Sequence, residues 1–173
     1  PGAGLPAGGT SFGAVYASSA AVNWSSGTGT AFNGPGASYL VVASTSPDYL
    51  GTNVSSYTYN VAGATLPLSA NTTYFFRVQA YNAGGMTDYS WLVIGSTPTS
   101  IEAPTDVIFT NVSDAAINMQ AFSPTGFSRL DQGSSGISFA LDGAYGGWAQ
   151  DINGSFSGLS PNTQFAISAR ARA

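Results

Sequence analysis

Three residue types that carry much of enzyme chemistry are missing from this 173-residue chain, which contains no cysteine, no histidine and no lysine. Without them the chain cannot form a Ser-His-Asp triad, a thiol nucleophile or a Schiff base. Disulfides and zinc sites built from Cys and His are excluded as well. The eight remaining carboxylates stand singly in turns and linkers, where aspartate ordinarily shapes the backbone. The sequence therefore predicts a protein that is not an enzyme.

Charge is also scarce, because four arginines are the only basic residues and the net charge is -4. So few cations argue against nucleic acid or an anionic membrane as partner. No apolar run approaches the ~20 residues of a membrane helix, so membrane insertion is not expected. What is abundant is small and polar: 40 serines and threonines and 22 glycines. This composition is typical of secreted β-proteins and predicts an extracellular or cell-surface location. The sequence has neither an initiating methionine nor a signal peptide, which indicates a mature or excised segment.

One stretch, residues 66–82, carries the strongest pattern. It opens with a turn signal at Ser69 to Asn71 and continues as a strand in which alternate residues are apolar. A similar sequence recurs 91 residues later, from Leu159 to Ala171. No segment has a 3.6-residue period, and turn signals separate short strands about every ten residues, which indicates an antiparallel sandwich. The fold class is therefore all-β.

The repeat predicts two tandem domains. The expected order is a linker at 1–9, a first domain at 10–98, a linker at 99–103 and a second domain at 104–173. Because Ala173 aligns with Asn82, the second copy lacks the counterpart of the last strand, expected at residues 89–95 of the first. Either the polypeptide continues, or another chain supplies that strand beside Phe165–Ala171.

These residues resemble the fibronectin type III domain. The resemblance is carried by Trp24, Tyr39 and the series Leu68, Asn71, Thr72, Tyr74, Arg77, Val78, Ala80, Asn82 and Gly85. It implies a seven-strand Greek-key, immunoglobulin-like sandwich, used as a spacer, adhesion or scaffold module, and it covers 10–98 more completely than 104–173. Met119 and Phe165 depart from the family pattern, and Phe165 has no hydroxyl for the corner hydrogen bond. The amino-acid sequences of residues 11–24 and 68–82 also resemble repeat modules of large bacterial extracellular and surface proteins.

Candidate sites are few. Five sequons mark candidate glycosylation sites at Asn23, Asn53, Asn71, Asn111 and Asn153, with O-linked sugars on exposed serines and threonines as the alternative. Candidate contact aromatics are Trp91, Tyr145 and Trp148, for which core or turn packing is the competing interpretation. Glu102 and Asp106 flank the linker, but two carboxylates are few for calcium, so solvation is favoured there. No metal, cofactor or catalytic site is expected, apart from covalent glycans.

The leading interpretation is a structural module of an extracellular repeat protein or surface filament, glycosylated, that acts in scaffolding or adhesion. Its expected partners are copies of itself or adjacent repeats. The alternative is a carbohydrate-binding or spacer module of a secreted polysaccharide-degrading enzyme or adhesin, with carbohydrate as the partner.

Overall fold

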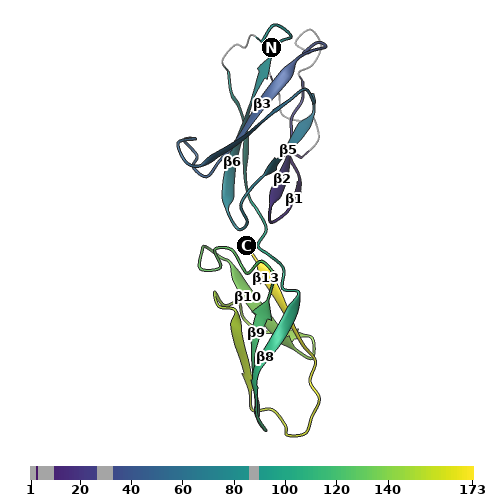
Figure 1. Cartoon of the computed structure of the whole chain (residues 1–173), viewed down its shortest axis with the longest axis vertical. Coiled ribbons are helices and arrows are strands. Elements are labelled where there is room, and N and C mark those ends of the chain that lie inside the picture. The colour runs from purple at the N-terminus through teal and green to yellow at the C-terminus, as the bar shows by residue number, and fades with distance from the viewer. Residues whose placement is uncertain (1–2, 4–9, 27–32, 86–89) are drawn as a thin grey trace. The chain divides into compact units, whose positions relative to one another are not determined.

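The computed structural model describes residues 3, 10–26, 33–85 and 90–173, and it divides the chain into two compact units, Pro1–Thr99 and Ser100–Ala173. The described residues form strands and turns without any α-helix, which confirms the all-β prediction (Figure 1). Accordingly, they include no helix that is long and apolar enough to cross a membrane. The predicted linker at 1–9, apart from Ala3, and the predicted strand start at Tyr89 lie outside the described residues.

Unit 1 is a sandwich of two antiparallel sheets with the strand orders β1-β2-β5 and β4-β3-β6-β7. Its strands are β1 (Phe12–Val15), β2 (Ser19–Asn23), β3 (Ser38–Ser44), β4 (Asn53–Thr58), β5 (Gly63–Pro67), β6 (Thr73–Tyr81) and β7 (Leu92–Pro98). The chain changes sheets between β2 and β3, between β4 and β5 and again between β5 and β6, as in a Greek key. The last strand ends later than predicted, because Pro98 and Thr97 pair with the first residues of β6, Thr73 and Tyr74.

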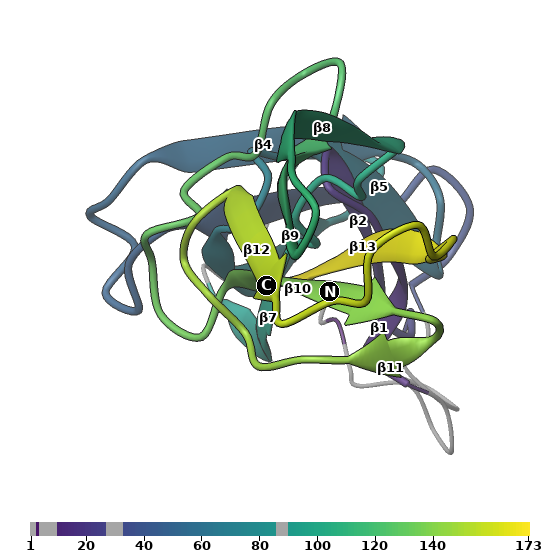
Figure 2. The same ribbon diagram turned by 90° about the horizontal axis from the view of Figure 1, so that it is seen from below.

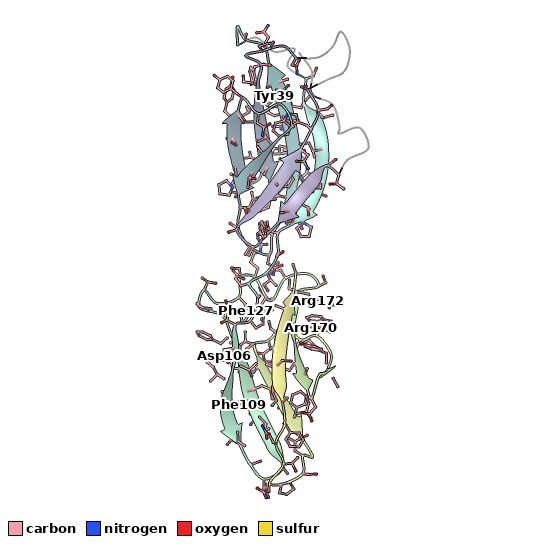
Figure 3. The ribbon with its side chains drawn as sticks, turned by 90° about the vertical axis from the view of Figure 1, so that its right-hand side faces the viewer. Tyr39, Asp106, Phe109, Phe127, Arg170 and Arg172 are labelled. Carbon is pink, nitrogen blue, oxygen red and sulfur yellow. The ribbon has the colours of Figure 1, made fainter. Side chains whose placement is uncertain are left out.

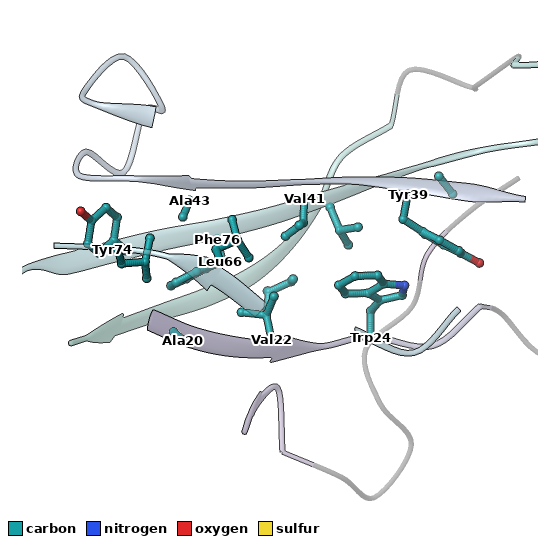
Figure 4. Close-up of a cluster of buried hydrophobic side chains, with 13 residues drawn as sticks. Ala20, Val22, Trp24, Tyr39, Val41, Ala43, Leu66, Tyr74 and Phe76 are labelled. Atoms are coloured by element: carbon teal, nitrogen blue, oxygen red, sulfur yellow. The ribbon is translucent and has the colours of Figure 1, made fainter. Parts of the chain in front are cut away.

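The core of unit 1 follows from alternation along the facing strands. Figure 4 shows Ala20, Val22 and Trp24 on the β2 side opposite Tyr39, Val41 and Ala43 of β3. The rings of Trp24 and Tyr39 lie 5.4 Å apart between centroids. The inward series of β6 completes the core, and its members are 0–2% exposed: Tyr74, Phe76, Val78 and Ala80.

The turn before β6 closes one end of this core. Asn71 adopts a left-handed backbone, with φ of 46°, which asparagine tolerates better than most residues. The buried Tyr74 hydroxyl then accepts the N–H of Ser69 at 3.2 Å. Thr72 and Thr99 exchange backbone and side-chain hydrogen bonds, with Thr72 N–H donating to Thr99 Oγ1 at 3.0 Å. These hydrogen bonds connect the turn before β6, strand β6 itself and the end of β7.

Unit 2 has the same two-sheet plan with six strands, as Figure 2 shows for β8, β9 and β12 in one layer and β10, β11 and β13 in the other. The strands are β8 (Asp106–Val112), β9 (Ala116–Phe122), β10 (Gly136–Leu141), β11 (Ala144–Tyr145), β12 (Asn153–Ser157) and β13 (Ile167–Arg172). No strand of the described chain pairs with the outer edge of β13. Among the described residues, unit 2 therefore has no strand in the position that β7 occupies in unit 1.

The incomplete sheet has two structural consequences. Strand β13 begins at Ile167 rather than at the predicted Phe165, because β10 ends at Leu141, its partner there, and nothing pairs on the other side. The inward residues of β13, Ile167, Ala169 and Ala171, are only half-buried. Their counterparts in β6 are almost fully buried, so the core of unit 2 is more open along this edge.

Candidate functional site

Several carboxylates of the described residues accept hydrogen bonds from backbone N–H groups, among them Asp106 from Val107 at 2.7 Å. Asp48 accepts hydrogen bonds from Ser46 Oγ at 2.6 Å and from the N–H of Leu50 at 2.9 Å, which together lower the pKa of its carboxyl. Asp142 accepts the N–H of Ala166 at 2.7 Å. The bonds from Leu50 and Ala166 satisfy backbone donors, so these groups shape loops rather than present an acid–base pair.

Asp151 and Glu102 follow the same pattern. The N–H and amide of Asn153 donate to Asp151 at 3.0 and 2.9 Å and lower the pKa of its carboxyl. Partial burial acts to raise the pKa of Glu102, but the N–H and Oγ of Ser128, at 2.8 and 2.5 Å, keep that pKa below its usual value. Both Glu102 oxygens are therefore engaged within unit 2. No three His, Cys, Asp or Glu residues of the described chain lie close enough together to hold a metal.

The chemically distinctive feature of unit 1 is an arginine stacked between two aromatic rings. Arg77 projects from the outer face of β6, and its guanidinium carbon lies 4.0 Å from the ring centroid of Tyr49 and 4.1 Å from that of Trp91. At such distances the cation is attracted by the ring quadrupoles. The Tyr49 hydroxyl donates to the carbonyl of Phe76 at 3.1 Å. Burial raises the pKa of Tyr49, while the Arg77 charge acts in the opposite direction.

Unit 2 carries a similar stack on the outer face of β13. The guanidinium carbon of Arg170 lies 3.9 Å from the centroid of Tyr145 and 4.8 Å from that of Trp148. Arg172, two residues further along the same face, lies 4.7 Å from Trp148. Figure 3 shows both arginines on β13. A Cβ on Gly136 would approach Trp148 Cβ to 3.3 Å, so the glycine leaves room for the Trp148 segment to pass over β10.

All three predicted contact aromatics therefore have an arginine of the same unit against a ring face. Trp91 and Trp148 are half-buried, and Tyr145 is 42% exposed. The sequence reasoning missed the arginines as site residues. Their positions in the sequence could have identified them, because Arg77 and Arg170 occupy outward positions on a strand whose alternate residues enter the core.

A second aromatic group lies on the sheet of unit 1 that contains β3 and β6. Tyr57 on β4 meets Tyr59 edge to face at 6.0 Å and Tyr81 at 5.8 Å between ring centroids. Tyr57 and Tyr59 are 54% and 72% exposed. The Tyr57 hydroxyl also forms a hydrogen bond with Ser38 Oγ. These rings are the more accessible aromatic surface of unit 1.

The five sequons differ in access. Asn53, Asn111 and Asn153 are exposed on strands β4, β8 and β12. Asn23 is half-buried, and its amide donates to the carbonyl of Thr10 at 3.1 Å. Asn71 is 9% exposed in the turn before β6. By exposure these three asparagines are the accessible candidates, while the amide of Asn53 donates to the carbonyl of Tyr49 at 3.0 Å and that of Asn153 donates to Asp151 at 2.9 Å.

Comparison with solved structures shows which known folds the chain resembles. The chain is similar to a two-domain fibronectin type III segment of chicken tenascin, with 15% identity over 93% of this chain and 87% of that one, and a TM-score of 0.59. It also aligns with domains FN1–FN3 of chicken CNTN1, at 18% identity over 98% of this chain and 63% of that one, with a TM-score of 0.38. A third match is the central fibronectin-III array of RIM-binding protein, at 13% identity over 99% and 58%, with a TM-score of 0.37.

No family model and no curated protein matches the sequence. The tenascin match nevertheless spans nearly the whole of both chains, so the chain has the fold of a tandem pair of fibronectin type III sandwiches. This agrees with the expectation from the residues around Trp24, Tyr39 and Tyr74.

Proposed function

We propose that this protein is a non-enzymatic structural module of an extracellular repeat protein or filament, in which it scaffolds or adheres through contacts with copies of itself. The observation that carries the proposal is how the polar groups are used. The hydrogen bonds of Asp48, Glu102, Asp142 and Asp151 hold the loops of the two sandwiches. The chemistry of these groups maintains the fold, as a mechanical module requires.

The outer sheet faces support the same proposal. An arginine between two aromatic rings covers apolar surface with a planar, weakly hydrated cation. The arginine stacks around Arg77 and Arg170 thus stiffen a face that in a secreted sandwich would otherwise expose tryptophan. With a net charge of only -4, solubility then depends on hydroxyls and on attached sugars. We assign those sugars to the exposed sequons at Asn53, Asn111 and Asn153.

Electron microscopy of the native assembly, together with its intact mass, tests this proposal. The expected result is an elongated polymer built from the repeat, with a mass above that of the polypeptide. Compact, monodisperse particles under native conditions would overturn the filament proposal. Asn53→Gln, Asn111→Gln and Asn153→Gln should each remove one glycan's mass, whereas Asn71→Gln should remove none.

Carbohydrate binding is the second candidate, and the exposed tyrosine pair favours it. Aromatic ring faces can stack on sugars, and Tyr57 and Tyr59 expose more of their rings than the tryptophans of the arginine stacks. A glycan array probed with the protein, its Tyr59→Ala variant and its Trp148→Ala variant would separate the two candidates. Specific binding lost in either variant would support carbohydrate recognition, and an absence of binding supports the structural role.

A further inference from the structure

The sheet of unit 1 that contains β3 and β6 turns one face away from the core, and we call this the outer face. On β6 the residues that alternate with the buried Phe76 and Val78 point to it, and Tyr57 of β4 does so as well. The outward face of an antiparallel sheet is ordinarily polar. This one gathers the rings of Tyr49, Tyr57, Tyr59, Phe75, Tyr81 and Trp91. An aromatic patch of this kind is typical of a contact site.

Arg77 gives the outer face a single positive charge, and it is the one basic residue of unit 1. Its Nε is buried and has no hydrogen-bond partner among the described residues. The one described carboxylate of unit 1, Asp48, is engaged within its own turn instead. Because Tyr49 and Trp91 cover the guanidinium, its N–H groups, which lie in the guanidinium plane, point out at the edge of the stack. An acceptor can approach the cation from that direction.

Gln79 places a second open donor beside this cation. It is the next outward residue of β6 after Arg77, ~7 Å further along the strand. The side chain is only 5% exposed, and its Oε1 accepts a hydrogen bond from the Tyr81 hydroxyl at 2.9 Å. Its Nε2 donates to no acceptor among the described residues. A buried amide with unused donors costs free energy that an incoming acceptor recovers.

Tyr57 and Tyr59 supply ring surface on the same outer face. Tyr57 and Gln79 pair with Leu40 from its two sides, so they lie two strands apart, at ~10 Å. The two tyrosines meet at an interplanar angle of 90° and remain more than half exposed. Such rings can stack on sugars. A ligand that reaches both the rings and the donors must contain several linked sugars.

We propose that the outer face of unit 1 binds an acidic oligosaccharide, with the carboxylate of one sugar held by Arg77 and Gln79 and a neighbouring sugar stacked on Tyr57 and Tyr59. A carboxylate fits because its two oxygens match the planar fork of a guanidinium. A densely sulfated chain fits less well, because the face carries one cation and the protein has a net charge of -4. The inference rests on the carbohydrate-binding candidate, and it names the class of sugar.

The two parts of this site contribute different terms to binding. Hydrogen bonds between Arg77 and a carboxylate are charge-assisted, and the rings around the cation keep water from its faces. That term requires the negative charge of the sugar and weakens as salt is added. Stacking on Tyr59 depends on the apolar face of the sugar ring and is the same for an acidic sugar and its neutral ester. The charge term and the stacking term can therefore be measured separately.

The test uses the full chain and two pairs of ligands in isothermal titration calorimetry. The pairs are hexagalacturonate and hexamannuronate, each with its fully methyl-esterified form, which keeps the sugars and removes the charges. At least one acid should bind saturably, and its ester should bind at least tenfold more weakly. Added salt should weaken the acid more than the ester. Heparin serves as the sulfated comparator and should bind more weakly than the acid.

Three variants assign the two terms to residues. Arg77→Gln should remove most of the difference between acid and ester, and Arg77→Lys should restore only part of it, because lysine keeps the charge but not the planar fork. Tyr59→Ala should weaken acid and ester by similar factors. Tyr16→Ala is the matched control and should change neither, since Tyr16 is 62% exposed and follows β1 in the other sheet. The comparison of acid with ester in the unmodified protein holds even where an Arg77 variant disturbs the fold.

Each outcome decides a different point. Equal binding of acid and ester, or tighter binding of heparin, would overturn the acidic-sugar inference and leave carbohydrate binding itself intact. No binding of any of these sugars would overturn both. The filament test has a separate readout, because an elongated polymer that binds no sugar keeps the structural role and refutes this inference. Acid binding by compact, monodisperse particles would do the opposite.

Discussion

The core of unit 1 depends most heavily on Trp24, and its replacement by alanine gives a direct measure of that dependence. The side chain is 2% exposed and contacts the ring of Tyr39 in a tilted arrangement, with 5.4 Å between ring centroids. Truncation removes the largest apolar side chain in the space between the sheets and leaves a cavity. Substitutions of this type cost about 3–5 kcal/mol. We expect Trp24→Ala to lower the free energy of unfolding of unit 1 by that amount.

The indole nitrogen allows a sharper version of this prediction. Trp24 Nε1 is buried without a hydrogen-bond partner among the described residues. A buried unsatisfied donor costs about 1–3 kcal/mol, which phenylalanine does not incur. Trp24→Phe loses some volume but removes that cost, so its net effect should be less than half that of Trp24→Ala.

Urea unfolding followed by tryptophan fluorescence separates the two units in these variants, because Trp91 remains in unit 1 and Trp148 in unit 2. The transition reported by Trp91 should shift, and the one reported by Trp148 should not. A shift below about 1 kcal/mol for Trp24→Ala would show that the residue does not support the core as a buried large side chain must. Equal costs for the alanine and phenylalanine variants would refute the reasoning about Nε1.

Three further outcomes follow from named contacts. Tyr74→Phe should destabilise unit 1 by about 1 kcal/mol in the same urea assay, because the hydroxyl that accepts the Ser69 N–H is lost. Glu102 has a lowered pKa in the folded state, so its contribution is complete above the ordinary value of 4.5 and is lost as pH falls through the lowered value. Urea unfolding between pH 7 and pH 3 should therefore show that the free energy of unfolding of unit 2 falls less with decreasing pH in Glu102→Gln than in the unmodified protein. Arg170→Ala should cost unit 2 about 0.5–1 kcal/mol by removing its cation–π contacts, and an unchanged midpoint would show that the stack contributes nothing.

Much of the fold could be predicted because alternation along a strand directly encodes which face is buried. The series Tyr74, Phe76, Val78 and Ala80 enters the core as the period-two pattern requires. The internal repeat carried the same interpretation to the second unit. It also showed that Ala173 aligns with Asn82, before the strand that closes unit 1.

The arginine stacks could not be predicted in the same way, because their members come from separate segments. Tyr49 lies in the turn before β4, Trp91 just before β7 and Arg77 on β6, and only the pairing of β3, β6 and β7 brings them together. The residue types alone identified the candidate aromatic side chains. Which arginine each ring contacts depends on the tertiary structure, and the alternation of residues along a single strand does not encode it. For the same reason the accessible pair Tyr57 and Tyr59 was not among the predicted contact aromatics.

The different starts of β6 and β13 show that a strand's extent depends on its neighbours as much as on its own residues. Strand β6 begins at Thr73 because the end of β7 pairs there on one side. In unit 2 the position that matches Thr73 is Gln164, and no strand pairs with it in this way. Strand β13 therefore begins only at Ile167, which is its first residue paired with β10.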